Sequence, residues 1–362
     1  MMNNVSHTDL LIIGGGINGV GIARDAAGRG VNVVLCEKGD LGCATSSAST
    51  KLIHGGLRYL EHYEFGLVSA ALKEREIILN AAPHIVRPLR FILPQSPDVR
   101  PNWLVRVGLF LYDFMGVRRR LPKSGSLDLR ETLYGESLNP SLKKAVYYSD
   151  CWLDDSRLVI LNAIDAAKLG ARILPRTECV FVEPNQTGEG WSVTLVDRKD
   201  KSKKTIHAKI LINAAGPWAG HCLSDIIQGL PKPILRLVRG SHIVVPQLFD
   251  HESAYIFQNP DNRIVFAIPY ERKYTMIGTT DCDFSGDLDK VQTCFLTIKL
   301  CVEDKRGMLR QFIVDDKGVV AIAFFGVRGH SFEDNEYRAA HVALAIVSAL
   351  KRYDLQAKCG VT

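Results

Sequence analysis

A glycine-rich turn between a short strand and a helix, close to the start of the chain, constrains the fold more than any other feature. Residues 10–13 form an apolar run, and glycines follow at positions 14, 16 and 19 with the spacing GxGxxG. Residues 17–30 then carry apolar side chains at helical spacing, and residues 31–36 form a second apolar strand ending at Glu37. This order predicts a Rossmann-like βαβ unit in a parallel sheet covered on both faces, and hence an α/β fold.

The same turn predicts a phosphate site. The first glycine permits the tight turn, the second lets backbone approach a pyrophosphate, and the third lets the helix pack on the strand. The helix N-terminus adds free N–H groups and the positive end of the helix dipole. We therefore expect five residues to hold a dinucleotide: Gly14, Gly15, Gly16, Asn18 and Gly19. A glycine turn without a ligand is the alternative interpretation.

Glu37 ends the second strand, where a carboxylate accepts hydrogen bonds from ribose hydroxyls. Its charge disfavours a 2′-phosphate, so NADP is not expected. The neighbouring Lys38 is included among the expected cofactor contacts.

Composition excludes several classes of function. The formal net charge of +6 suits an anionic small molecule or membrane surface, and no long basic run with interleaved aromatic residues points to nucleic acid. Nine cysteines without a CxxC pair argue against a disulfide framework or zinc site; no metal site is predicted, and reduced thiols in a cytosolic protein are expected. No secretory signal is recognisable, and no apolar run reaches the roughly 18 residues of a membrane span.

Two further segments favour FAD over NAD, which the glycine turn alone does not separate. Residues 43–49 are small and rich in hydroxyl groups, so they can wrap a long dinucleotide; a solvated loop is the alternative. Residues 211–218 form a short strand that runs into a turn of small residues. That turn would bring backbone close to the cofactor, although an ordinary strand-to-helix turn explains the same pattern.

Longer motifs extend this pattern: IIGGGINGVGIARDAAGRG from residue 12, ATSSASTKLIHGGLRYLEHYEFGLV from 44, DCWLDDSRLV from 150, NAAGPWAG from 213, RGSHIVVP from 239 and IGTTD from 277. Through these motifs, residues 9 to about 285 resemble the FAD-dependent glycerol-3-phosphate dehydrogenases of the aerobic bacterial type. That family lies within the D-amino-acid-oxidase-like flavoproteins, and KLIHGGLRYLE is close to diagnostic for it.

The resemblance implies a Rossmann-like FAD-binding domain with an inserted, mainly β substrate domain. We expect the FAD-binding domain to be discontinuous, over residues 1–95 and 145–225. Residues 96–144 and 226–290 would form the substrate domain and connecting segments, and residues 291–362 a divergent C-terminal segment.

The resemblance also assigns site residues by their place in the matching motifs. Candidate flavin contacts are Thr45, Ser46, Ser47, Ala48, Lys51, His54, Gly55, Gly56, Val180, Ala215 and Gly216. Candidate catalytic and substrate residues are Arg58, Tyr59, His242 and Arg328. Arginine offers the bidentate cation that suits a phosphate dianion. His242 would contact substrate or accept the hydroxyl proton; a strand histidine hydrogen-bonded in the core is the alternative.

The activity implied by the resemblance is oxidation of sn-glycerol 3-phosphate to dihydroxyacetone phosphate, with hydride passing from C2 to the flavin N5 and electrons passing on to a quinone. It implies a cytoplasmic protein attached peripherally to the inner face of the cytoplasmic membrane, and a homodimer is considered. A related FAD-dependent amino-acid or amine oxidase is the second hypothesis. A non-catalytic, truncated flavoprotein fragment is the third.

The third hypothesis arises because the resemblance stops at about residue 290. The GVRPL-like and GGK-type segments of the family are not clearly present; only the short GVRG around Arg328 is similar. Residues 336–350 instead predict one apolar helix. Another apolar helix is expected over residues 103–117. It would be a buried core helix or, with the basic residues after it, would lie in a membrane interface.

Overall fold

The computed structural model describes residues 7–95, 102–115, 121–185, 189–227, 235–259, 263–279, 282–284, 288–315, 318–326 and 332–353, with residues 355, 357–359 and 361. The chain forms two compact units, Met1–Asp283 and Phe284–Thr362. The finer domain boundaries given above stay a prediction.

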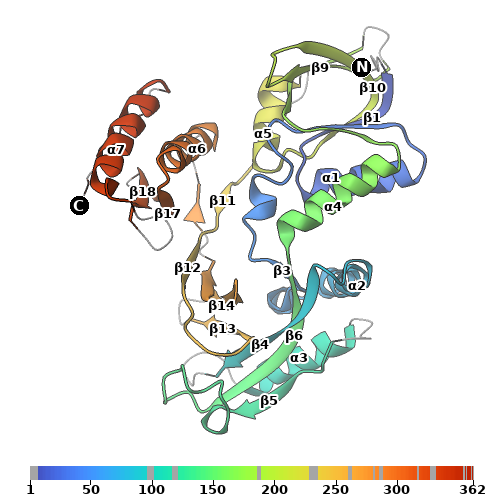
Figure 1. The fold of residues 1–362 in the computed structure, drawn as a ribbon. Coiled ribbons are helices and arrows are strands. Elements are labelled where there is room, and N and C mark those ends of the chain that lie inside the picture. The colour runs from blue at the N-terminus through green and yellow to red at the C-terminus, as the bar shows by residue number, and fades with distance from the viewer. Residues whose placement is uncertain are drawn as a thin grey trace. The chain divides into compact units, whose positions relative to one another are not determined.

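A six-stranded sheet with a parallel centre begins the first unit (Figure 1). Its order is β7 (Arg172–Leu174), β2 (Val33–Cys36), β1 (His7–Ile13), β10 (Lys203–Asn213), β9 (Trp191–Asp197) and β8 (Thr177–Pro184). Strands β7, β2, β1 and β10 are parallel, whereas β9 and β8 are added antiparallel. The carboxyl ends of β1, β2 and β10 therefore meet at one edge, where open α/β sheets place their ligands.

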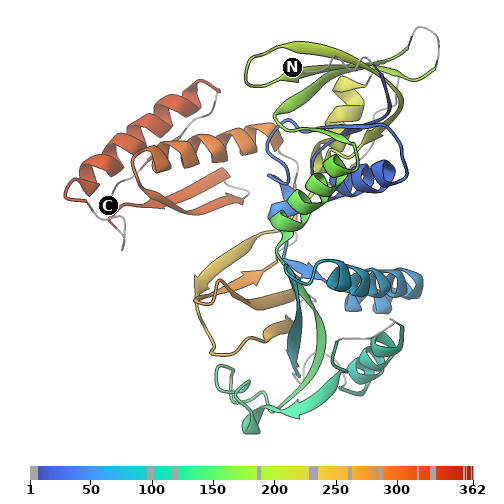
Figure 2. The same ribbon diagram turned by 45° about the vertical axis from the view of Figure 1, so that its right-hand side comes forward.

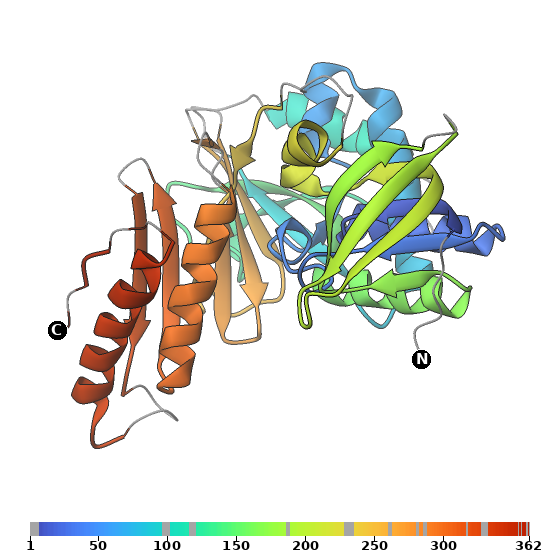
Figure 3. The ribbon, with the colours of Figure 1, turned by 90° about the horizontal axis from the view of Figure 1, so that it is seen from above.

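Helices α1 (Ile17–Gly28) and α4 (Asp155–Lys168) cover one face of this sheet (Figure 3). Their buried side chains pack on Ile12 and Leu35. The other face is covered partly by α5 (Ala219–His221) and η5 (Cys222–Ile226). Burial on both faces explains the apolar runs of β1 and β2, and the predicted Rossmann-like fold is confirmed.

A second, eight-stranded sheet follows (Figure 2). Its order is β12 (His242–Pro246), β15 (Tyr274–Gly278), β14 (Ile264–Tyr270), β13 (Ala254–Gln258), β4 (Val86–Pro94), β6 (Lys144–Leu153) and β3 (Leu52–Ile53), with β5 (Gly125–Asp128) paired to β6. All neighbours are antiparallel except β13 and β4. The short strands β11 (Val238–Arg239) and β16 (Cys282–Asp283) pair separately. This sheet combines strands from residues 242–278 with β3, β4 and β6, which come largely from residues expected in the FAD-binding domain.

Helices α2 (Phe65–Ala81) and α3 (Asn102–Met115) pack on this second sheet. Leu109 and Tyr112 on the inner side of α3 are buried, whereas Trp103, Phe110 and Phe114 are exposed. The helix therefore has one core face and one apolar surface face. Besides α5 and η5, the described part of this unit contains the short helices η1 (Thr45–Ser47), η2 (Leu57–His62), η3 (Leu129–Glu131) and η4 (Gly216–Trp218).

The second unit consists of α6 (Leu288–Asp304), the hairpin β17 (Met308–Asp315) and β18 (Gly318–Phe324), and α7 (Asn335–Lys351). Side chains of α6 and α7 share a small core with the hairpin. The helix expected over residues 336–350 is confirmed as α7. Across the part of the chain that the structure describes, no helix has both the length and the apolar character needed to cross a bilayer.

Candidate functional site

The glycine turn sits at the carboxyl end of β1, and two of its glycines are sterically required. Gly14 has a φ of +110°, and a Cβ there would lie 2.4 Å from the carbonyl oxygen of Ala214. A Cβ on Gly19 would lie 1.9 Å from the carbonyl oxygen of Gly14. Since both obstacles are backbone atoms, no side-chain rotation relieves them, and only glycine lets α1 start this close to the strand.

The N-terminus of α1 presents free donors. Its N-cap is Gly16, which has no side chain to cap the first turn. The Ser46 hydroxyl accepts a hydrogen bond from the Ile17 amide at 3.0 Å. Among the described residues, the Asn18 and Gly19 amides have no hydrogen-bond partner. These amides and the helix dipole favour an anion at this point.

The Glu37 carboxylate faces the same turn. Its Oε2 accepts from the Gly15 amide at 2.8 Å, and its Oε1 accepts from the Gly39 amide at 2.7 Å. Each carboxylate oxygen has a second lone pair available for a sugar hydroxyl. The residue is therefore beside the turn, where the sequence predicted it.

Residues 213–218 reach the turn from β10. The Ala214 amide donates to the Ile13 carbonyl at 2.8 Å, which continues the β1–β10 pairing into the turn. Gly216 has a φ of +56° and open space where a Cβ would project. The Lys38 ammonium lies 4.5 Å from the centre of the Trp218 ring, a cation–π contact. Lys38 and the segment containing Ala215 and Gly216 are thus brought together.

Val180 lies farther along the sheet, in β8. The β8–β9 register shifts between Cys179 and Phe181, so Val180 is the extra residue of a β-bulge. A bulged residue is left out of the strand ladder, so its backbone can serve another partner.

Residues 45–51, which we call the strap, are fixed to the start of α4 by a buried carboxylate. Asp155 accepts from the Lys51 ammonium at 2.6 Å and from the Ser49 hydroxyl at 2.8 Å. Burial raises the pKa of Asp155, but the bonds from Lys51 and Ser49 outweigh it, and the pKa lies below its usual value. Lys51 also points at the Ser47 carbonyl, at 3.4 Å.

Sequence reasoning missed Asp155, although a signal existed. DCWLDDSRLV has two adjacent carboxylates where α4 begins. Asp154 caps the helix by accepting from the Arg157 amide, but Asp155 is buried. A buried carboxylate requires a cationic or hydrogen-bonding partner, and only the fold reveals which one.

The loop of residues 54–56 follows the strap. His54 Nδ1 accepts from the Gly56 amide at 3.0 Å, and the Gly55 amide donates to the Tyr112 hydroxyl at 2.7 Å. Gly56 has a φ of +69° and precedes η2, on which Tyr59 is partly exposed. The backbone of Arg58 belongs to η2, and its side chain lies outside the described part.

His242 begins β12 and meets the strap. Its Nε2 lies 3.2 Å from the Thr50 hydroxyl oxygen. Burial, and then the Lys51 charge, lower the pKa of His242, which favours the neutral imidazole. Arg328 lies outside the described residues.

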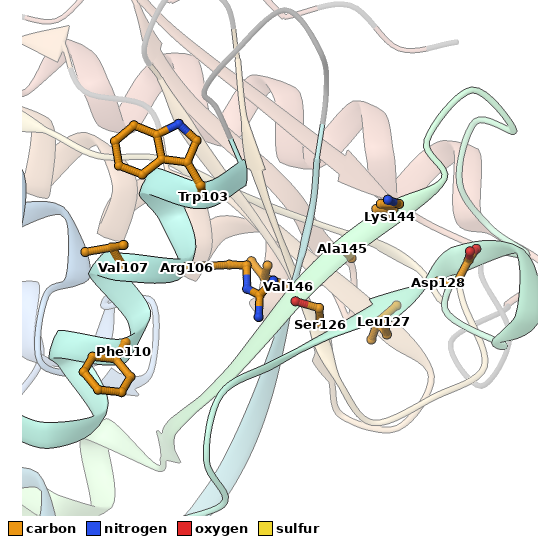
Figure 4. A pocket seen from close by; sticks show the side chains of 10 residues that line it. All are labelled: Trp103, Arg106, Val107, Phe110, Ser126, Leu127, Asp128, Lys144, Ala145 and Val146. Atoms are coloured by element: carbon orange, nitrogen blue, oxygen red, sulfur yellow. The ribbon is translucent and has the colours of Figure 1, made fainter.

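An open hollow of about 810 Å³ occurs away from these residues, between α3, β5 and β6 (Figure 4). Arg106 extends into it from α3, beside Trp103 and Phe110, and Lys144 lies on its strand side. None of the site residues predicted from the sequence lines it.

Comparison with known proteins agrees with this geometry. The profile of the FAD dependent oxidoreductase family matches residues 9–328. A glycerol-3-phosphate dehydrogenase of Pseudomonas aeruginosa is 53% identical over 283 residues, which are 78% of this chain and 54% of that protein. A D-erythritol 1-phosphate dehydrogenase of Brucella abortus is 50% identical over 283 residues, 78% of this chain and 56% of that protein.

The solved structure of glycerol-3-phosphate dehydrogenase from Bacillus halodurans, complexed with FAD, is similar with a TM-score of 0.60 and 27% identity. The similarity covers 99% of this chain and 67% of that one. The chain spans about half the length of the curated relatives that it matches. With a family profile matched over most of its residues and a glycine turn flanked by Glu37 and Ser46, the chain belongs to the FAD dependent oxidoreductase family.

Proposed function

We propose that this chain binds FAD at the glycine turn and oxidises sn-glycerol 3-phosphate to dihydroxyacetone phosphate. The observation that carries the proposal is the convergence of the Glu37 carboxylate and the Ser46 hydroxyl on one turn with unpartnered amides. These groups fit a ribose next to a diphosphate. The name of the Pseudomonas aeruginosa relative supports the substrate.

Different residues around the turn would bind different parts of the cofactor. Gly14 to Gly19 would hold the diphosphate, Glu37 the adenosine ribose, and the backbone of bulged Val180 the adenine side. The strap, the 54–56 loop and the segment at Ala215 would hold the flavin end. FAD, when bound, supplies the hydride acceptor that protein side chains lack.

Substrate chemistry requires a fixed cation and a proton acceptor. Arg58 and Arg328 would bind the phosphate dianion, since guanidinium groups do so bidentately, and Tyr59 would contact the substrate beside them. As hydride leaves C2, the C2 hydroxyl must lose a proton to form the carbonyl group. His242 would accept that proton, because its lowered pKa keeps it neutral.

The test uses the purified chain with added FAD, kept anaerobic. Bound flavin should bleach on addition of glycerol 3-phosphate and should not bleach with glycine or proline. D-erythritol 1-phosphate is included because a relative acts on it. Bleaching by an amino acid alone would favour the amine-oxidase hypothesis, and folded protein that binds no flavin would favour the non-catalytic fragment.

We further propose a quinone as electron acceptor, peripheral attachment to the inner face of the cytoplasmic membrane, and a homodimer. The exposed face of α3 supports attachment: Trp103, Phe110 and Phe114 are 66%, 60% and 68% exposed, and Arg106 and Lys144 lie nearby. Aromatic side chains next to cations suit an anionic lipid interface.

Phe110→Ser/Phe114→Ser should reduce co-sedimentation of the protein with anionic vesicles. Unchanged binding would contradict attachment through this face of α3. Sedimentation velocity would test the dimer.

A further inference from the structure

The 54–56 loop is tied to a charged cluster inside an apolar core. Tyr112, on the inner face of α3, accepts from the Gly55 amide and donates to the Asp150 carboxylate, whose oxygens lie 2.8 and 2.9 Å away. Asp150 in turn accepts from Arg75 of α2 at 2.5 Å. Tyr112 and Arg75 have no solvent exposure, and Asp150 has 1%.

This cluster is costly to bury. Buried Glu76 also accepts from Arg75, at 3.2 Å, so the cluster contains three charged side chains. Its surroundings are Val68, Leu72, Leu109 and Tyr148, where apolar residues would pack without desolvating these charges. Arg75 also donates to the Ser149 carbonyl at 3.3 Å, whereas its Nε has no hydrogen-bond partner within the described residues. A buried ion pair is weak evidence for stability, and through the Tyr112 hydroxyl this cluster also binds the Gly55 backbone amide.

That amide belongs to a segment with little other support. Gly55 and Gly56 follow β3, which has only two residues, and Gly56 has left-handed backbone geometry. A Cβ on Gly55 would lie 2.8 Å from the Tyr112 oxygen and 2.4 Å from Leu72, so the backbone is pressed against the cluster. Beside this anchor, the Gly56 amide fixes the ring of His54 through Nδ1.

We propose that Tyr112 is a positioning residue for the cofactor: backed by Asp150 and Arg75, its hydroxyl holds Gly55 and thereby sets His54 and Gly56 where the flavin is expected. The inference rests on the proposed flavin site but concerns residues outside it. Because Tyr112 has no solvent exposure, it would act on the cofactor through the Gly55 amide.

The test compares Tyr112→Phe with Tyr148→Phe in the full chain. Tyr148 is buried in the same core and packs edge-on against Tyr112, with ring centres 5.7 Å apart, but its hydroxyl makes no hydrogen bond among the described residues. Loss of one such hydrogen bond should raise the Kd for FAD about tenfold in Tyr112→Phe and alter the bound-flavin spectrum. Tyr148→Phe should leave both unchanged. Equal effects of the two variants on Kd and spectrum would overturn the proposal.

A second measurement does not depend on FAD. Amide hydrogen exchange of Gly55 in the cofactor-free chain should be slow in wild type and in Tyr148→Phe, and at least about tenfold faster in Tyr112→Phe. If Tyr112→Phe does not fold, the wild-type rate decides: a Gly55 amide that exchanges like an open loop would refute the anchor. Should the wild-type chain bind no FAD, the proposed function fails while the exchange data still judge the anchor.

Discussion

The glycine turn and the 54–56 loop both bring backbone to the expected cofactor, but they are held by different means. The turn is shaped by residues within one βαβ unit, where Gly14 and Gly19 leave room and Glu37 closes the end of the next strand. The loop is held by Tyr112 of α3, Asp150 of β6 and Arg75 of α2. The glycine turn depends on residues that lack side chains, whereas the 54–56 loop depends on buried charged side chains. The two regions should therefore respond differently to substitution.

The largest effect is expected where a buried charge loses its partner. Arg75→Leu should lower the free energy of unfolding by about 3–5 kcal/mol, because Asp150 and Glu76 stay buried without their shared cation. Arg75→Leu/Glu76→Leu/Asp150→Leu, which removes all three charges, should recover most of the loss. Trp103, Trp152, Trp191 and Trp218 all lie in the first unit, so tryptophan fluorescence during urea denaturation reports its unfolding.

The exposed pair Arg24–Asp165 is the control for that prediction. Arg24→Leu should cost less than about 1 kcal/mol. If Arg75→Leu lowers the free energy of unfolding no more than Arg24→Leu does, the 54–56 loop is not held by buried charges.

A substitution in the glycine turn should act through a steric clash with backbone atoms. Gly19→Ala places a Cβ against the Gly14 carbonyl, so backbone must move, and we expect a loss of about 2–4 kcal/mol together with FAD binding. Gly21, in the same helix, has open space at its Cβ position. Gly21→Ala should therefore be neutral or stabilising by up to about 1 kcal/mol. Similar losses in both variants would show that helix propensity, not the close approach, matters.

The strap is a polar loop that is held, like the 54–56 loop, by a buried carboxylate. Asp155→Asn should cost about 1–3 kcal/mol at neutral pH, as Lys51 loses its partner. Because the folded-state pKa of Asp155 is lowered, its contribution is complete above about pH 3.9 and is lost as pH falls through the folded-state pKa. The difference between wild type and variant should shrink in acid; a constant difference would exclude the carboxylate charge as its source.

The smallest effect concerns His242. With its pKa lowered by burial and by Lys51, the folded state loses stability as pH falls below about 6.5, where the unfolded chain binds the proton more readily. Lys51→Met removes the charge and should move the His242 titration, followed by NMR, to higher pH. A titration that stays in place would assign the whole shift to burial.

The sequence was sufficient for the region whose chemistry is local. The positions of Gly14, Gly19 and Glu37 follow from one strand–turn–helix pattern, and the apolar runs predicted the parallel sheet. Longer motifs predicted the strap and the loop but not what holds them. Asp155 is 104 positions from Lys51, and Tyr112 is 57 from Gly55, and these contacts arise only from the tertiary fold.

Two further features also required the structure. The bulge at Val180 depends on the register between β8 and β9, which no local pattern specifies. For the helix at 103–117 the sequence left a buried core helix and a membrane-interface helix as alternatives, and α3 has one buried face and one exposed apolar face. Periodicity shows that a helix is amphipathic but not which neighbours its side chains meet.

The two faces of α3 have a thermodynamic consequence. Tyr112 binds the 54–56 loop from the buried face, while Trp103, Phe110 and Phe114 are exposed, so one helix connects the loop with the protein surface. Linkage is reciprocal: if a surface bound to the outer face changed the affinity for FAD through this helix, FAD would change the affinity for that surface by the same factor.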